Sequence, residues 1–197
     1  MQLVVNEEMV IRLPDMTEKD FYDFCALNGD YRIERTAMGD ILIMAPAGGE
    51  TANRNMGLSE QLQRWTRHNG KGVAFDSSAA FHLPNGATLS PDASWVLKSR
   101  LAKLTREQKR RFLPLCPDFV IELTSPSDRI SKVQEKMREW IDNGAQLGWI
   151  LHPDAKRVYI YRPGAKVEIL REPARVCGEG PVEGLVLDLA EIWDVGW

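Results

Sequence analysis

Two acidic residues on apolar segments are the first features of this sequence that could do chemistry. Glu122 lies within the apolar stretch PDFVIELT, and Asp92 follows a proline in a second such stretch, SPDASWVL. A carboxylate in such a place must be solvated, paired or bound to a cation, because burying it alone is very costly. If neighbouring strands bring the two together, they make a hard oxygen site suited to Mg²⁺ or Mn²⁺. Such an ion activates water beside a phosphate, so the pattern indicates phosphodiester hydrolysis.

A third component, a cation, is available on the segment that follows Glu122. Residues 131–143 carry apolar side chains at helical spacing, and Gly144 follows them as a stop signal. Lys136 borders that apolar stripe and can therefore reach back toward the sheet, with Lys132 as the next candidate one turn earlier. We expect Lys136 to position water or to stabilise the transition state.

Each of these residues also has a simpler interpretation. Asp92 could cap a turn after its proline, and Glu122 could be a structural carboxylate paired with Lys136. Lys136 could pack its aliphatic stem and leave its ammonium group in water. Asp118, at the start of the Glu122 strand, fits a turn or strand-edge role better than the role of a metal ligand.

The elements that must position these residues can be read along the chain. Hydrophobic periodicity and turn residues predict helices over 16–29, 50–68 and 131–143, and hairpins over 31–46 and 148–164. Further strands are expected within 72–97 and 117–124, and a last strand or two with a short ending after residue 164. Because no repeat or linker interrupts this order, we expect one domain over residues 1–197, of α/β or mixed α+β class.

Composition narrows the class of protein. The apolar fraction of 44% and the charged fraction of 27% are those of an ordinary globular chain. No apolar run approaches the roughly 20 residues that span a bilayer, and residues 1–14 lack a signal-peptide pattern. The three cysteines form no metal-binding or redox motif. We therefore expect a cytoplasmic protein with no membrane partner.

A basic segment over residues 98–111 contrasts with the net charge of −3 for the whole chain. Its basic residues are Lys98, Arg100, Lys103, Arg106, Lys109, Arg110 and Arg111, against the single acid Glu107. We expect a helical insertion whose cations grip phosphates of a nucleic acid. A solvated helix face is the equally simple alternative.

The order and spacing of these motifs resemble a known family. The Pro-Asp92 pair, Glu122 followed by SPSD, the EKMREW helix and the WILHP hairpin resemble the Uma-type family of the PD-(D/E)XK restriction-endonuclease-like superfamily. The resemblance also takes in the hairpin of residues 31–46, the GGE opening of the second helix and the closing LVLDLAEIW, so it covers nearly the whole chain.

The resemblance implies a twisted mixed sheet flanked by helices, with Asp92 and Glu122 as ligands of Mg²⁺ or Mn²⁺. The lysine that usually follows the strand acid by two residues is replaced here by Thr124, and Lys136 matches a lysine moved to the next helix. Glu50 resembles an additional acidic residue of the superfamily, although an acidic first-turn residue favoured by the helix dipole is the simpler reading.

The expected activity is metal-dependent endonuclease cleavage of DNA by water, with a homodimer pairing two sites. Two alternatives stay open at this point. One is a catalytically inactive nucleic-acid-binding or interaction protein on the same fold. The other is a metal hydrolase acting on small phosphate esters.

Overall fold

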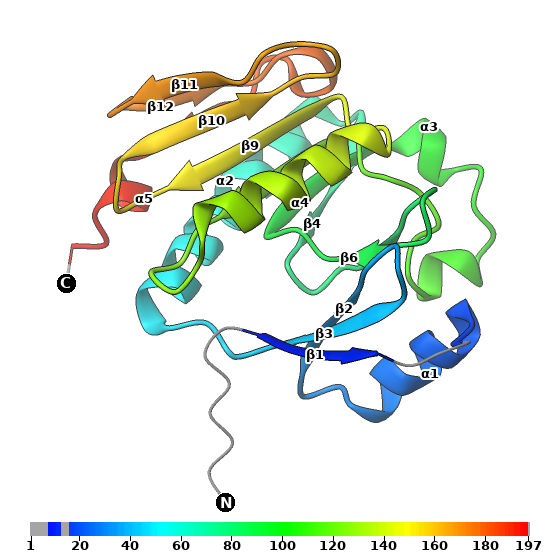
Figure 1. The fold of residues 1–197 in the computed structure, drawn as a ribbon. Helices are drawn as coiled ribbons and strands as arrows, with labels where there is room; N and C mark the ends of the chain where they lie inside the picture. The colour runs from blue at the N-terminus through cyan, green and yellow to red at the C-terminus, as the bar shows by residue number, and fades with distance from the viewer. Residues whose placement is uncertain (1–7, 13–15, 197) are drawn as a thin grey trace, which may run out of the picture.

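The computed structural model describes residues 8–12 and 16–196. The prediction that no signal peptide is present concerned residues 1–14. Of these, the structure describes only residues 8–12. The molecule is built on a central sheet with a helix on each face, and a second sheet packs below it in the view of Figure 1. Within residues 8–12 and 16–196, no helix is both long and apolar enough to cross a membrane.

The central sheet has six strands in the order β11-β10-β9-β8-β7-β4. Its members are β4 (Gly72–Asp76), β7 (Ala93–Leu97), β8 (Phe119–Leu123), β9 (Leu147–His152), β10 (Arg157–Tyr161) and β11 (Glu168–Arg171). The sheet is mixed, because β8 and β9 run parallel while every other neighbouring pair is antiparallel. A parallel pair needs a crossover connection, and the helix α4 (Ile130–Asp142) provides it.

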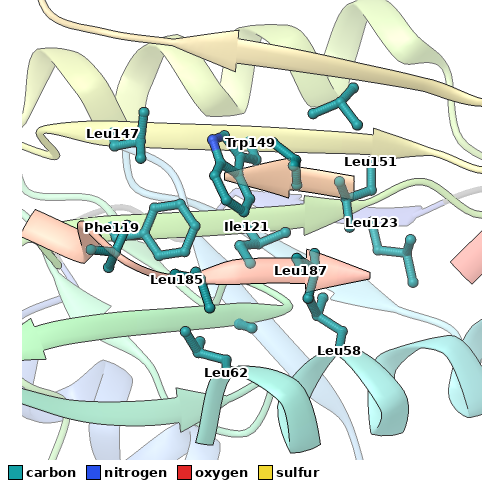
Figure 2. Close-up of a cluster of buried hydrophobic side chains, with 14 of the residues drawn as sticks. Leu58, Leu62, Phe119, Ile121, Leu123, Leu147, Trp149, Leu151, Leu185 and Leu187 are labelled. Atoms are coloured by element: carbon teal, nitrogen blue, oxygen red, sulfur yellow. The ribbon is translucent and has the colours of Figure 1, made fainter. Parts of the chain in front are cut away.

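Both faces of the central sheet are buried, which explains why β8 is apolar at almost every position. One face packs against α2 (Gly49–Asn69) through Leu58 and Leu62, and Figure 2 shows these leucines below the side chains of β8 and β9. The other face packs against α4 through Met137 and Trp140. The predicted strand and both predicted helices are therefore confirmed.

Two glycines lie at the contact and at the end of helix α4. A Cβ at position 148 on β9 would lie 2.2 Å from the sulfur of Met137, so a larger residue there would displace the Met137 side chain. Gly144, with a φ of 115°, closes the helix as its sequence position predicted. These glycines allow α4 to pack against β9 and to end before it.

The second sheet has five strands in the order β1-β3-β2-β6-β5. They are β1 (Glu8–Arg12), β2 (Arg32–Arg35), β3 (Asp40–Met44), β5 (Phe81–His82) and β6 (Thr88–Leu89). β2 and β3 form the predicted hairpin, whereas β1 was not predicted. The helix predicted over 16–29 is α1 (Glu18–Leu27), and it starts with a capping box in which Thr17 and Asp20 satisfy each other's backbone amides.

The end of the chain closes the α2 side of the central sheet. It forms a small ladder of β12 (Arg175–Cys177) and β13 (Val186–Asp188), with the 3₁₀ turn η2 (Gly180–Val182) between them and the short helix α5 (Ala190–Trp193) after them. Leu185, Leu187 and Ile192 from this region join the same core as Leu58 and Leu62.

The prediction of a helical insertion over residues 98–111 was wrong for most of that segment. It contains only α3 (Lys98–Leu101) and the 3₁₀ turn η1 (Gln108–Arg110), joined by turns. Leu101 and Leu104 are the apolar residues that pack on the core from its first part. Because most helical stability comes from packing an apolar face, this segment has too little of one to hold a long helix.

Candidate active site

The pairing of β7 with β8 brings Asp92 and Glu122 together. Ala93 pairs with Ile121 across these antiparallel strands, so the next position sets Asp92 opposite Glu122 on the same face. The amide of Leu123 donates a hydrogen bond of 2.8 Å to Asp92 Oδ2, which fixes the Asp92 carboxylate against β8. Both acids are buried, with exposures of 8% and 4%.

Helix α4 supplies the partners of Glu122. The indole Nε1 of Trp140 donates to Glu122 Oε1 at 2.8 Å, and the ammonium of Lys136 lies 3.2 Å from the same oxygen. Lys136 and Trp140 are four residues apart and so share one face of the helix. Lys136 therefore reaches back toward the sheet as its position beside the apolar stripe predicted, while Arg138 is exposed.

Strand β2 contributes two charged residues that the sequence interpretation missed, Arg32 and Glu34. Arg32 Nη1 donates to Asp92 Oδ1 at 3.2 Å, and Glu34 Oε1 accepts from Lys136 Nζ at 2.9 Å. Arg32 and Glu34 flank the apolar Ile33 in a predicted strand, so they could have been noticed for the same reason as Glu122, a charged residue within an apolar strand. No local spacing could reveal their partners, because Glu34 and Lys136 are 102 positions apart.

The buried charges shift one another's protonation. Burial raises the pKa of Glu122 to about 7, and the negative charges of Asp92 and Glu34 add to this while Lys136 opposes it. Burial alone would lower the pKa of Lys136, but Glu122 and Glu34 outweigh it and hold that pKa above its ordinary value. The group thus holds three carboxyl groups, Glu34, Asp92 and Glu122, with two cationic side chains, Arg32 and Lys136.

These groups line a cleft of about 1020 Å³ between the β2–β3 hairpin, the start of α2, and α4 with the loop before it. Its wall on the hairpin side includes the apolar Leu42 and Met44, and its wall on the other side includes residues 125–129 and Lys132. Glu50 also lines the cleft, but it is paired at 3.1 Å with Arg54, one turn further along α2. The cleft thus gathers all four predicted catalytic residues, with Glu50 outside the hydrogen-bonded group.

The seven basic residues of the segment 98–111 lie elsewhere. None of them is among the described residues that line the cleft. Arg100 is used structurally, since its Nη1 donates at 2.8 Å to the fully buried Asp118. Asp118 also accepts from the amide of Leu97 and from Gln146, so it has the structural role at the start of the strand that its position favoured.

The donor set fits a divalent cation of the Mg²⁺ or Mn²⁺ type. Asp92 and Glu122 offer hard oxygen ligands from neighbouring strands, and Glu34 adds a third carboxyl group next to the same two cationic side chains. In the part of the chain that the structure describes, no three acidic, histidine or cysteine side chains form a complete metal site. Two protein carboxylates with water and phosphate oxygens are nevertheless the usual ligand set of Mg²⁺.

The sequence matches a known protein family over the part of the chain that forms the cleft. A family model named Uma2 and described as "Putative restriction endonuclease" matches residues 18–190, which include every residue that lines the cleft. The chain belongs to the Uma2 family. No curated protein sequence matches it significantly. Membership of the Uma2 family supports nuclease function in general terms.

A solved structure supports the Uma2 fold. A crystal structure described as "a putative nuclease belonging to DUF820" from Anabaena variabilis matches with a TM-score of 0.68 and 20% sequence identity. The match covers 82% of this chain and 89% of that one. At this identity the likeness bears on the fold, and it confirms the predicted mixed sheet flanked by helices.

Proposed function

We propose that the chain is a metal-dependent endonuclease that hydrolyses phosphodiester bonds of DNA in the cleft. The observation that carries the proposal is the convergence of Asp92, Glu122 and Lys136, from three different elements, on one buried group. Two carboxylates beside a lysine and an arginine are more than the fold needs for stability, because a buried ion pair seldom improves on apolar packing.

The roles of the residues follow from their contacts. Asp92 and Glu122 are the residues that would hold Mg²⁺ or Mn²⁺. When bound, such an ion supplies activation of water and neutralises charge on the phosphate. Lys136, beside Glu122, orients the attacking water or stabilises the charge that develops on the phosphate oxygens. Water attacks phosphorus directly, the ester P–O bond breaks, and no covalent enzyme intermediate forms. Glu50 assists from the edge of the cleft.

A second candidate function is a nucleic-acid-binding or interaction protein that keeps the fold without catalysis. The ion pairs of Asp92 with Arg32 and of Glu122 with Lys136 favour it, since carboxylates neutralised within the protein need no metal. The count of charged groups weighs against it, because Glu34 shares the same two cations, so that three carboxyl groups face two cationic side chains.

The experiment is incubation of supercoiled plasmid and of single-stranded DNA with the protein and Mg²⁺ or Mn²⁺. Asp92→Ala, Glu122→Gln and Lys136→Ala should abolish cleavage. Arg138→Ala is the matched control for Lys136, because Arg138 lies on the same helix with its side chain exposed. Cleavage that survives all three cleft substitutions would overturn the site. Absence of cleavage by the wild type, together with no metal binding, would favour the non-catalytic candidate.

A further inference from the structure

Glu34 is a buried acid to which the catalytic roles above give no task. Its exposure is 3%, and an acid that deep needs partners to stay charged. Its Oε1 atom accepts from the amide of Ser90 at 3.0 Å and from Lys136 Nζ at 2.9 Å, and it lies 3.6 Å from Arg32 Nη2. One oxygen of Glu34 thus connects strand β2, helix α4 and the segment that leads into β7.

The ammonium of Lys136 has three protons to donate, and the structure gives it three acceptors. They are Glu34 Oε1 at 2.9 Å, the carbonyl of Ser90 at 2.9 Å and Glu122 Oε2 at 3.5 Å. The contact with Glu34 is shorter than the contact with Glu122. Glu34 therefore holds the lysine more closely than Glu122 does, and Glu122 stays available to another partner.

The same two residues of β2 hold the backbone that carries Asp92. The amide of Ser90 donates to Glu34, and its carbonyl accepts from Arg32 as well as from Lys136. Ser90 stands two residues before Asp92, with Pro91 between them. Both backbone polar groups of Ser90 are thus held from β2, and Glu34 contacts both Lys136 and the residue two positions before Asp92.

We propose that Glu34 is a positioning residue of the active site: it holds the ammonium of Lys136 beside Glu122 and ties it to the segment that carries Asp92. This inference rests on the proposed function insofar as Lys136 acts on the reacting phosphate. Without Glu34, the lysine loses its shorter carboxylate contact, and a long flexible side chain on a helix then turns toward water.

The first test needs neither metal nor substrate. The wild type, Glu34→Gln and Glu34→Asp are treated with limiting acetic anhydride, and acetylation of Lys136 is measured by mass spectrometry against the exposed Lys166. Both variants should raise the relative acetylation rate of Lys136 on the order of tenfold, the effect of losing one charge-assisted hydrogen bond. Asp118→Asn, which removes a buried carboxylate away from the cleft, should leave it unchanged.

Unchanged acetylation of Lys136 in both variants would overturn the proposal. A uniform rise at every lysine in both variants would also overturn it, because Glu34 would then support the fold as a whole. Neither result depends on nuclease activity. If the wild type cuts no DNA, the proposed function fails, and the acetylation rates still decide whether Glu34 positions Lys136.

The second test separates positioning from direct participation. Glu34→Gln should lower kcat for DNA cleavage about tenfold or more, with little change in KM, because the ammonium is misplaced in the transition state. In a Lys136→Met background the same substitution should have no further effect, since its route of action is already removed. An equal loss in both backgrounds would overturn the proposal and make Glu34 a direct participant.

Discussion

Asp118 and Glu122 are two buried acids four residues apart, and they serve different purposes. Asp118 accepts hydrogen bonds from a backbone amide, an arginine and a glutamine, and it is completely inaccessible. Glu122 accepts from Trp140 and Lys136, and it lies opposite a second carboxylate at the wall of a cleft. Burial of a carboxylate therefore does not identify an active site. The identity of its neighbours does.

The two acids also act on different parts of the molecule. Asp118 holds Arg100, and with it the start of the basic segment, at the start of β8. Burial is the main cause that raises the pKa of Glu122 to about 7, and the negative charges of Asp92 and Glu34 add to it. Asp118 has Arg100 as its charged partner, whereas Glu122 shares Lys136 with Glu34 and lies opposite Asp92.

The largest expected effect is on cleavage. Glu122→Gln should lower the rate of plasmid nicking roughly a thousandfold, the equivalent of the several kcal/mol that a metal ion contributes to the transition state. Asp118→Asn should keep most of the wild-type rate at a temperature where it is folded. Initial rates of nicking in Mg²⁺, normalised to the folded fraction by circular dichroism, check both. Similar losses in the two variants would remove the distinction between the acids.

The second effect is on stability, and here Asp118→Asn should cause the larger loss. Asp118→Asn should lower the free energy of unfolding by about 2–4 kcal/mol, because Arg100 and the amide of Leu97 lose a charged acceptor. Glu122→Gln should leave it unchanged or raise it at this pH, since an amide still accepts from Trp140 and costs less to bury. Urea denaturation at pH 7.5 measures both. A larger loss for Glu122→Gln would contradict the comparison.

The third effect is the dependence of stability on pH. The pKa of Glu122 is about 7 in the folded chain against an ordinary value of 4.5, so the folded state keeps a proton that the unfolded state has lost between these values. Relative to Glu122→Gln, the wild type should therefore lose stability as the pH rises from 5 to 8. Mn²⁺ should restore the loss at pH 8. Parallel pH profiles for the two proteins would mean that folding does not raise the pKa of Glu122.

The smallest effect concerns the basic segment that Asp118 anchors. Lys103, Arg106 and Lys109 are exposed there, away from the cleft. If they contact phosphates, their replacement by alanine should weaken DNA binding a few-fold and reduce the slope of log K against log salt by about one per contact. Lys166→Ala, another exposed lysine, is the control. An unchanged slope in fluorescence anisotropy titrations would make the segment a solvated surface.

The sequence alone predicted the parts of the fold that depend on local signals. The capping box of Thr17, the stop at Gly144 and the apolar stretch of β8 are such signals, and the structure confirms all three elements. It also led to Asp92, Glu122 and Lys136, because the two acids interrupt apolar stretches and the lysine borders the apolar stripe of its helix.

The rest depends on contacts between distant segments. Glu34 and Arg32 belong to the site only because β2 lies across from α4, and no pattern within the hairpin shows this. The basic segment was misjudged for a related reason, since charge alone does not show whether a helix has a face to bury. Local patterns thus predicted the elements, whereas assembly of the cleft required the tertiary structure.

Isothermal titration calorimetry of Mn²⁺ binding, at pH 8 without DNA, tests directly whether Asp92 and Glu122 hold the catalytic ion. Wild type and Asp118→Asn should bind Mn²⁺ with similar affinity, and both Asp92→Asn and Glu122→Gln should lose that binding. Equal binding by all four proteins, or loss only in Asp118→Asn, would contradict the assignment of Asp92 and Glu122 as the acids that hold the catalytic ion.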